Sequence, residues 1–405
     1  MLIEPIPNGN VTTPQGFRAG AVCAGMYAGG LKAGALDLAL LVSDRECSAG
    51  GVFTRNLVKG APVVVCRERL AQGRLRAVVA NSGNSNSLNG PGGYRDATEM
   101  TELAASHLGL APEEVAVSST GVTGVAMPME KVRAGLPRIG VDRDGGSAFA
   151  HAIMTTDTYG KECAFAVRDE AGVYYVGGCA KGSGMIHPDM ATMLAYVTTD
   201  AAVERGLLQR LTAEVADETL NMLSVDGDTS CSDTLLVFAN GAAGGPRVEA
   251  GSARAEAFRD ALRAVCLQLT RLLARDGEGA GRMIEVEVHG AVSLADARRV
   301  ARTITTSPLV KTAVAGADPN WGRILVAAGR AGAALEEAKT SMRLQGELLL
   351  DRGTAQPFDE ETLHQKLAAD EVRIELDLGL GDAVARAWGC DLTTEYVHIN
   401  ADYRT

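Results

Sequence analysis

Aromatic side chains are scarce in this chain of 405 residues, since Phe, Trp and Tyr together account for only 4% of it. A large core must therefore be built from aliphatic residues, and 46% of hydrophobic residues is enough for one in a chain of this length. No apolar run reaches the roughly 18 residues that cross a bilayer, so the sequence predicts no membrane role. The length itself favours two or three structural units.

Positive charge is also in short supply. Lys and Arg number 39 against 50 Asp and Glu, which gives a formal net charge of −11, and no basic cluster stands out. Because proteins bind nucleic acids mostly by neutralising phosphates, this balance argues against a nucleic-acid partner. The first residues, Met1–Pro5, lack the basic and apolar regions of a secretory signal, so we expect a cytoplasmic location.

Closely spaced cysteine pairs are absent as well. None of the eight cysteines belongs to a Cys-x-x-Cys motif, and several lie within apolar runs such as 63–66 and 265–267. This pattern is typical of buried, reduced thiols in a cytoplasmic protein. The six histidines are scattered along the chain, so no zinc site is expected.

Many short apolar runs, rich in β-branched residues and bounded by turn residues, predict strands. Helical periodicity predicts four helices, two of which follow a capping residue, Asp96 or Ser293. The predicted strands cover 36–42, 62–66, 77–80, 115–118, 164–167, 173–176, 193–197, 235–238, 284–288, 344–350 and 372–378, and the helices cover 97–108, 255–274, 294–303 and 358–367.

Strands and helices follow one another here without a strict repeat. This order predicts an α/β or mixed α+β fold and does not favour a barrel or a doubly wound sheet. A Gly-rich stretch after the long predicted helix indicates a boundary near residue 282, which divides the chain into domains 1–282 and 283–405.

One segment is hard to explain as ordinary core. Glycines and a proline lead from Lys181 to Thr192, where a strand is expected to begin. A hydroxyl is a weak nucleophile that needs a base beside it, and a threonine at a chain's N-terminus can use its own α-amine. This amine titrates near ~7.7–8, which suits base catalysis at neutral pH. From spacing alone, the simpler interpretation of Thr192 is a β-branched strand residue.

The same segment, Lys181–Leu194, resembles the cleavage site of the ornithine acetyltransferase family of arginine biosynthesis, also called the ArgJ family. Further segments resemble signatures of that family along nearly the whole chain. Because they occur in one order, a chance match is implausible. They are Asn81–Asn86, Ser119–Gly124, Met154–Thr158, Val225–Ser230, Asp276–Ala280, Gly316–Arg323 and Asn400–Thr405.

The resemblance implies a fold and a processing step. The fold would consist of layered sheets and helices, as in self-cleaving aminopeptidases, with a smaller C-terminal α/β domain. The chain would cut itself between Ala191 and Thr192 into an α chain of residues 1–191 and a β chain of residues 192–405. The two chains would then assemble as α2β2.

The resemblance also assigns site residues. Thr192 matches the nucleophile, and Thr120 and Gly121 match an oxyanion hole, which needs donors aimed at the oxygen of a tetrahedral intermediate. The implied substrates, N-acetylornithine and glutamate, carry carboxylate and ammonium groups that a cation such as Lys181 and an anion such as Glu278 can bind. Of Thr155 and Thr156, Thr155 is the first choice. Matches to substrate-binding positions are Thr155, Lys181, Thr192, Glu278, Asn400 and Thr405.

The implied activity is acetyl transfer from N2-acetylornithine to glutamate through an acetyl-Thr192 intermediate, without a metal or organic cofactor. Whether acetyl-CoA is a second acetyl donor stays open. One alternative is a self-cleaving aminopeptidase or amidase of the same broad fold, and another is an unprocessed binding protein. Thr192 and the tail at 400–405 favour the transferase.

Other features receive simpler interpretations. The Gly-rich stretch 276–281 lacks the Gly-Lys-Ser/Thr ending of a phosphate-binding loop. We interpret His187 as structural or cleavage-assisting and Cys231 as a packing residue. The chain has Gly281-Arg282 where the family pattern usually has Thr-Lys, and this departure bears on substrate preference.

Overall fold

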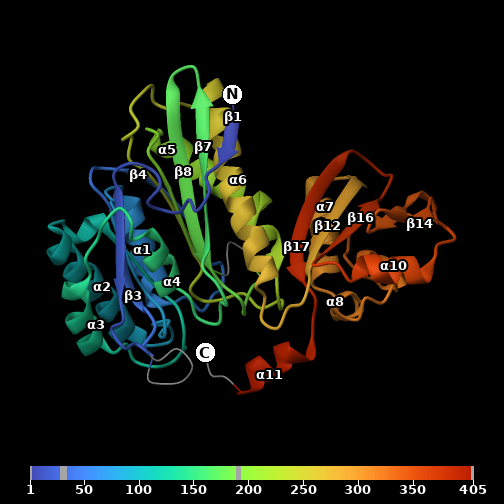
Figure 1. Cartoon of the computed structure of the whole chain (residues 1–405), viewed down its shortest axis with the longest axis horizontal. Helices are drawn as coiled ribbons and strands as arrows, with labels where there is room; N and C mark the ends of the chain where they lie inside the picture. The colour runs from blue at the N-terminus through green and yellow to red at the C-terminus, as the bar shows by residue number, and fades with distance from the viewer. Residues whose placement is uncertain (1, 28–33, 188–192, 403–405) are drawn as a thin grey trace.

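The structure is a computed structural model that describes residues 2–27, 34–187 and 193–402. In this part of the chain the strands form three sheets, of six, four and seven strands. Figure 1 shows the four-stranded sheet at one side, the six-stranded sheet in the middle and the seven-stranded sheet at the other side, with helices packed around them. The mixed α+β class predicted from the sequence is therefore confirmed.

The six-stranded sheet has the order β1-β7-β8-β9-β11-β4. β9 runs antiparallel to β8 and parallel to β11, and β11 pairs antiparallel with the edge strand β4. Lys181 at the end of β8 pairs with Leu194 at the start of β9. The strands are β1 (Leu2–Pro5), β4 (Ser48–Phe53), β7 (Lys161–Asp169), β8 (Gly172–Lys181), β9 (Leu194–Thr199) and β11 (Thr234–Ala239).

The four-stranded sheet, of order β2-β3-β5-β6, packs both of its faces. Successive side chains of a strand point to opposite faces. In β3, Leu38 and Leu40 join the apolar cluster formed with α2 and α3, whereas Ala39 and Leu41 join the cluster shared with the six-stranded sheet. The elements are β2 (Phe17–Val22), β3 (Leu38–Ser43), β5 (Ala77–Asn81), β6 (Val115–Ser119), α1 (Ala61–Gln72), α2 (Gly90–Leu108), α3 (Met129–Gly135) and α4 (Gly146–Ala152).

The six-stranded sheet is likewise covered on both faces. In β9, Leu194 and Tyr196 face the cluster shared with the four-stranded sheet, and Ala195 and Val197 face α5 (Arg205–Glu218) and α6 (Ala253–Arg275). The layers therefore run helix, sheet, sheet, helix. Such a sandwich buries nearly continuous apolar strands, as the sequence of β9 shows.

The seven-stranded sheet has the order β10-β17-β12-β16-β13-β14-β15. α7 packs on β12 and β17, and the apolar cluster around α6 continues into this sheet. The strands are β10 (Leu223–Ser224), β12 (Met283–Ala291), β13 (Ser341–Leu344), β14 (Glu347–Asp351), β15 (Thr354–Ala355), β16 (Glu371–Asp377) and β17 (Ala383–Cys390). The helices are α7 (Leu294–Thr305), α8 (Pro308–Ala315), α9 (Gly322–Gly329), α10 (Glu360–Leu367) and α11 (Thr394–Asp402).

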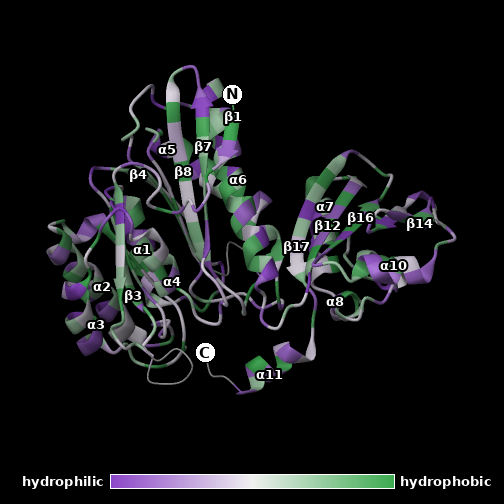
Figure 2. Cartoon of the chain, in the orientation of Figure 1, coloured by the Kyte–Doolittle hydropathy of each residue, from purple (hydrophilic) through white to green (hydrophobic). Residues whose placement is uncertain are grey.

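The C-terminal helix α11 leaves the seven-stranded part of the molecule and runs back below its middle (Figure 1). The helices α2 and α6 show hydrophilic and hydrophobic stretches in alternation along their length (Figure 2), as helices with one buried face do. No helix of the described residues is both long and apolar enough to cross a bilayer. The division into domains 1–282 and 283–405 stays a prediction.

Most predicted elements are confirmed, including the helix after Ser293, whose hydroxyl accepts a hydrogen bond from the Asp296 N–H as an N-cap. The predicted strand at 62–66 is wrong, because these residues open α1. Pro62 fits the first turn of a helix, where its missing N–H is not needed. Val63 and Val65 are buried there, so tertiary packing overrides their β preference.

Two further predictions need correction. α2 begins at Gly90 after the cap residue Asn89, about two turns before the cap predicted at Asp96. The single strand predicted at 344–350 is a hairpin, in which β13 and β14 are joined through Gln345 and Gly346. Both residues have positive φ, of 49° and 82°, which is typical of a tight two-residue hairpin turn.

Candidate active site

A small cavity lies where ends of β6, β8 and β9 meet loops that follow α4 and α6. Its volume of about 110 Å³ is several times what one water molecule needs. It brings together the predicted residues Thr120, Gly121, Thr155, Lys181, Glu278 and Asn400, and it also includes Thr156. The predicted residues Ala191, Thr192 and Thr405 lie outside the described residues, but Met193 lines the cavity.

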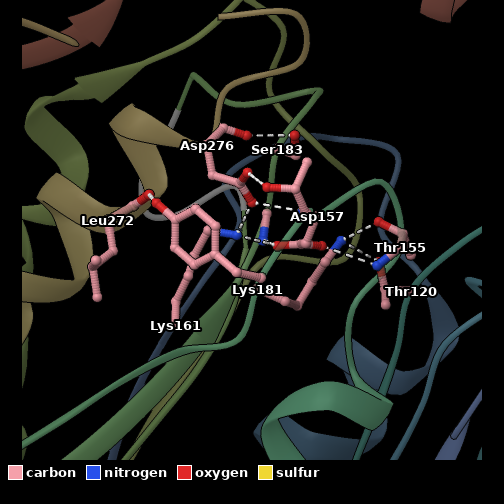
Figure 3. A network of polar contacts seen from close by, with 11 residues as sticks. Thr120, Thr155, Asp157, Lys161, Lys181, Ser183, Leu272 and Asp276 are labelled. Carbon is pink, nitrogen blue, oxygen red and sulfur yellow. Dashed lines mark hydrogen bonds and ion pairs between the residues drawn. The ribbon is translucent and has the colours of Figure 1, made fainter. Parts of the chain in front are cut away.

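The Lys181 ammonium group, at the buried end of β8, organises one wall of the cavity (Figure 3). It donates hydrogen bonds to Thr155 Oγ1 at 2.7 Å and to Thr120 Oγ1 at 3.2 Å. An ammonium group can only donate, so both hydroxyl oxygens act as acceptors in these contacts. Each hydroxyl thus keeps its own proton to donate elsewhere, for example to a ligand in the cavity.

A buried ionic cluster lies behind Lys181 (Figure 3). The fully buried Lys161 Nζ is 2.6 Å from Asp157 Oδ1 and 2.5 Å from Asp276 Oδ2. Burial alone would raise the pKa of Asp157, but the charges of Lys161 and Lys181 outweigh it and hold the pKa below its usual range. Asp157 is therefore an anion in the folded protein.

The same Asp157 carboxylate fixes two backbone segments of the site. Its Oδ1 accepts from the Gly182 N–H at 2.6 Å, and its Oδ2 accepts from the Thr155 N–H at 2.9 Å. Ser183 Oγ donates to the Asp276 carbonyl oxygen at 2.5 Å. The ionic cluster thus sets both the position of the Lys181 head group and the course of the chain after it.

The Thr120-Gly121 turn is held against the Asn-rich loop by a close backbone approach. Gly121 has a φ of 124°, and a Cβ at this position would lie 2.5 Å from the carbonyl carbon of Gly83. The Thr120 N–H donates to the Asn81 carbonyl oxygen at 3.0 Å. Only glycine fits at 121, and its backbone N–H adjoins the hydroxyl of Thr120 in the cavity wall.

Glu278 supplies negative charge on another wall. It is buried, its carboxylate accepts from Asn400 Nδ2 of α11 at 2.8 Å, and its N–H donates to the Ser183 carbonyl oxygen at 3.0 Å. A Cβ on Gly184 would come within 2.3 Å of the Glu278 carboxyl group. The glycine therefore makes room for the carboxylate, and the returning α11 orients it.

The chain between Lys181 and the predicted cleavage site is anchored by Asp226. Its carboxylate accepts from the N–H groups of Met185 at 2.6 Å and Ile186 at 2.9 Å. His187 is held from both sides, since Arg302 contacts its Nε2 at 2.8 Å and Ser224 Oγ contacts its Nδ1 at 3.1 Å. A guanidinium group only donates, so Nε2 is the acceptor, and these contacts support a structural role for His187.

Sequence reasoning missed Lys161 and Asp226 as determinants of the site. A signal existed for Lys161, because it lies two residues before the apolar run Cys163–Val167, and a lysine that is buried there must find a partner. Cys231, interpreted as a packing residue, lines the cavity and has its Sγ 3.1 Å from Ser87 Oγ. Arg282, where the chain departs from the family pattern, is not among the residues that line the cavity. Its guanidinium group donates to the carbonyl oxygens of Val314 and Ala315 near the end of α8.

The chain as a whole is similar to a family of known proteins. The profile of the ArgJ family matches residues 23–405. The arginine biosynthesis bifunctional protein ArgJ of Symbiobacterium thermophilum is 49% identical over 399 residues, which are 98% of this chain and 99% of the relative. The protein of the same description from Dehalococcoides mccartyi is 47% identical over 403 residues, which are 100% of this chain and 99% of the relative.

One solved structure is also similar. The crystal structure of the arginine biosynthesis bifunctional protein argJ from Bacillus halodurans has 42% sequence identity and a TM-score of 0.51. The match covers 52% of this chain and 100% of that chain.

Replacing Lys161 tests the ionic cluster. Lys161→Met leaves Asp157 and Asp276 buried without their shared cation, so the free energy of unfolding should fall by about 3–5 kcal/mol at neutral pH. Asp157, with its lowered pKa, stabilises the fold at neutral pH, and this contribution is lost as the pH falls through that pKa. Without Lys161 the Asp157 carboxylate takes up a proton more readily, so the difference in unfolding free energy between variant and wild type should shrink on acidification.

Urea unfolding followed by circular dichroism, at neutral pH and near pH ~4, measures both effects. The matched control is Arg168→Met on the same strand, whose ion pair with Glu4 is about half exposed and should matter by about 0.2–1 kcal/mol. Equal losses in the two variants would contradict a special role for the cluster.

Proposed function

This chain belongs to the ArgJ family, and from that premise we propose that it is an acetyltransferase that activates itself by cutting the Ala191–Thr192 bond. Members of the family are enzymes of arginine biosynthesis, and so is this chain. The proposed reaction moves an acetyl group from N2-acetylornithine to glutamate and yields ornithine and N-acetylglutamate. We expect it to take place in the cytoplasm.

The first proposed step creates the nucleophile. The Thr192 hydroxyl attacks the carbonyl carbon of Ala191, the peptide bond becomes an ester, and water hydrolyses that ester. Ala191 then ends one chain with a carboxylate, and Thr192 begins the other with a free amine. The fixed backbone of Met185 and Ile186 on Asp226 supports this step, because it holds the preceding segment in one course.

The second proposed step is acetyl transfer. The α-amine of Thr192 takes the proton of its own hydroxyl, and the oxygen attacks the acetyl carbonyl carbon of N2-acetylornithine. The Thr120 hydroxyl and the Gly121 N–H donate to the resulting oxyanion. When the intermediate collapses, the ornithine nitrogen leaves with a proton from the amine, and acetyl-Thr192 remains. The amine of glutamate then attacks this ester, and the bond between the acetyl carbon and the Thr192 oxygen breaks. The α-amine of Thr192 passes the proton lost by the glutamate nitrogen to this oxygen, so N-acetylglutamate and free Thr192 result.

The observation that carries this proposal is the contact between Lys181 Nζ and Thr120 Oγ1. It occupies the hydroxyl oxygen with a cationic donor, which makes the hydroxyl proton a better donor and directs it away from the lysine. The negatively charged Glu278 suits a substrate ammonium group, and Asn400 orients the Glu278 carboxylate. Thr155, Thr192 and Thr405 complete the proposed substrate site.

The proposal has two extensions, one concerning a second acetyl donor and one concerning assembly. Both sequence relatives are named as bifunctional proteins, which favours a second activity, and we include acetyl-CoA as a second acetyl donor for glutamate. We also propose an α2β2 assembly of the two cleavage products. In analytical ultracentrifugation, the processed protein should have twice the combined mass of one α chain and one β chain.

Processing is tested by the mass of the denatured protein. Wild-type protein should show two fragments divided between Ala191 and Thr192, whereas Thr192→Ala should stay at the mass of the intact chain. Thr340→Ala is a control, because its hydroxyl bonds the Glu336 carbonyl oxygen far from the site, and it should be cut normally. A wild-type protein that remains one intact species over time would refute self-cleavage.

The oxyanion hole is tested by Thr120→Val, which keeps the shape of the side chain and removes the donor. We expect kcat to fall by about 10²–10³-fold with little change in KM, because the donor acts mainly on the transition state. Processing is checked first by mass. The control Thr101→Val removes a hydroxyl that bonds to Thr98 within α2 and should leave kcat nearly unchanged.

The covalent intermediate predicts ping-pong kinetics, with parallel lines when initial rates are measured against both substrates. Intersecting lines would argue for direct transfer between two bound substrates. Free acetate produced without an amine acceptor would instead favour a hydrolase, such as a self-cleaving amidase.

A further inference from the structure

The Asn-rich loop has no role in the proposed function so far. It runs from Asn81, the last residue of β5, to Asn89, which precedes α2. Most of its residues are buried, so their polar groups need partners inside the protein. Asn86 and Leu88 have positive φ angles, of 47° and 62°. A leucine keeps such a conformation only where its surroundings impose it, so the contacts of this loop hold it in place.

The backbone of the loop pairs with the oxyanion turn, residues 119–126. Asn84 forms isolated β-bridges with Thr120 and with Val122, the residues on either side of the oxyanion glycine. Residues 121–126 are all partly or fully exposed, so apolar packing contributes little to their position. The position of the turn therefore depends on its hydrogen bonds with the loop.

The side chain of Asn84 makes a second connection to the turn. Its Nδ2 donates to the carbonyl oxygens of Val125 and Ala126, each at 3.1 Å. Its Oδ1 accepts from the Asn86 N–H at 2.8 Å. The side chain is 3% exposed, and its amide uses both hydrogens of the nitrogen as well as the oxygen. A carboxylate of the same shape would donate no hydrogen bond, so these contacts need an asparagine.

Asn89 holds the same turn from the side of α2. It is the cap residue of this helix, yet its side chain makes no capping hydrogen bond. Its Nδ2 donates instead to the Val125 carbonyl oxygen at 2.9 Å and to Asn86 Oδ1 at 3.0 Å. Asn86 Nδ2 donates in turn to the Gly93 carbonyl oxygen within α2 at 2.8 Å. The turn, the loop and the start of α2 are thus one hydrogen-bonded unit.

We propose that Asn84 is a positioning residue for acetyl transfer, which acts through the turn on Thr120 and Gly121. Donors stabilise an oxyanion when they are held in place before the reaction, and the side chain of Asn84 supplies that constraint. Asn89 supports the turn from the other side. This inference rests on the proposed function, because the oxyanion belongs to that reaction.

Replacing Asn84 by aspartate tests the proposal in the full-length protein. Asn84→Asp keeps the shape, removes both donors and sets a carboxylate against two carbonyl oxygens. We expect kcat for transfer from N2-acetylornithine to glutamate to fall by about 10- to 100-fold with little change in KM, because small displacements of the oxyanion donors act mainly on the transition state. Processing is checked first by mass.

The matched control is Asn240→Asp. Asn240 is also buried, and its Nδ2 donates to the Gln15 carbonyl oxygen at 2.9 Å and to Ser43 Oγ at 3.3 Å. It follows β11 at the end away from Asp233, which lines the cavity. This variant should lose stability in urea unfolding and keep the kcat of wild type. Equal kcat values in the two aspartate variants would overturn the proposal, because a purely structural role predicts no selective effect.

Amide hydrogen exchange follows the turn independently of the reaction, and also in a folded variant that is not cut. The N–H groups of Ser85 and Gly124 donate across the contact, to the carbonyl oxygens of Val122 and Ser87, both at 3.0 Å. They should exchange about tenfold faster or more in Asn84→Asp, and at the wild-type rate in the control. Unchanged exchange in Asn84→Asp would overturn the proposal. Wild-type protein that transfers no acetyl group would count against the proposed function, and the exchange rates would still show whether this side chain holds the turn.

Asn89→Asp decides the case in which circular dichroism shows that Asn84→Asp does not fold. Asn89 is only partly buried, and this change removes its bonds to Val125 and Asn86. We expect a folded protein whose kcat is lower by about threefold or more. A wild-type kcat in this variant would then overturn the proposal.

Discussion

The ion pairs of Lys161 with Asp157 and Asp276 are the contact on which the catalytic cavity depends. Taking three charges out of water is costly, so such a cluster is kept only when each charge is compensated and hydrogen-bonded. Here the compensation extends outward. The Asp157 carboxylate accepts hydrogen bonds from the backbone of Gly182 and Thr155. The positive charge of Lys181 helps to lower the pKa of the same carboxylate. A set of buried charges thereby positions polar groups that a hydrophobic core could not orient.

Close backbone contacts at two glycines complete the cavity. Gly121 lets the oxyanion turn lie directly against the Asn-rich loop, and Gly184 leaves space for the carboxylate of Glu278. Both contacts join segments that are far apart in the sequence. Neither would tolerate a side chain without movement of backbone or of a charged group, so the wall positions follow from the absence of a Cβ at these two residues.

Sequence reasoning predicted the strands well where apolar runs were flanked by turn residues, as in β5 and β11. It failed at Val63 and Val65, whose β preference is overridden by burial in α1, and at Gln345-Gly346, where a turn lay inside one apolar run. The site residues came from matching motifs, which report identity and not position. Lys161 and Asp226 were missed because their importance lies in contacts with residues distant in sequence, such as Asp276 and Met185.

The pairing of Lys181 with Leu194 has a consequence for a chain cut between those two residues. The central sheet would then alternate between products, since β1, β7, β8 and β4 come from one piece while β9 and β11 come from the other. The two pieces could not separate while remaining folded, because separation would expose the buried interior of a sheet. Unfolding would change from a one-body to a two-body process, and reassembly after denaturation would depend on protein concentration. Breaking one peptide bond would thus turn the folding of one molecule into the association of two. Only the intact precursor could form this sheet within a single molecule.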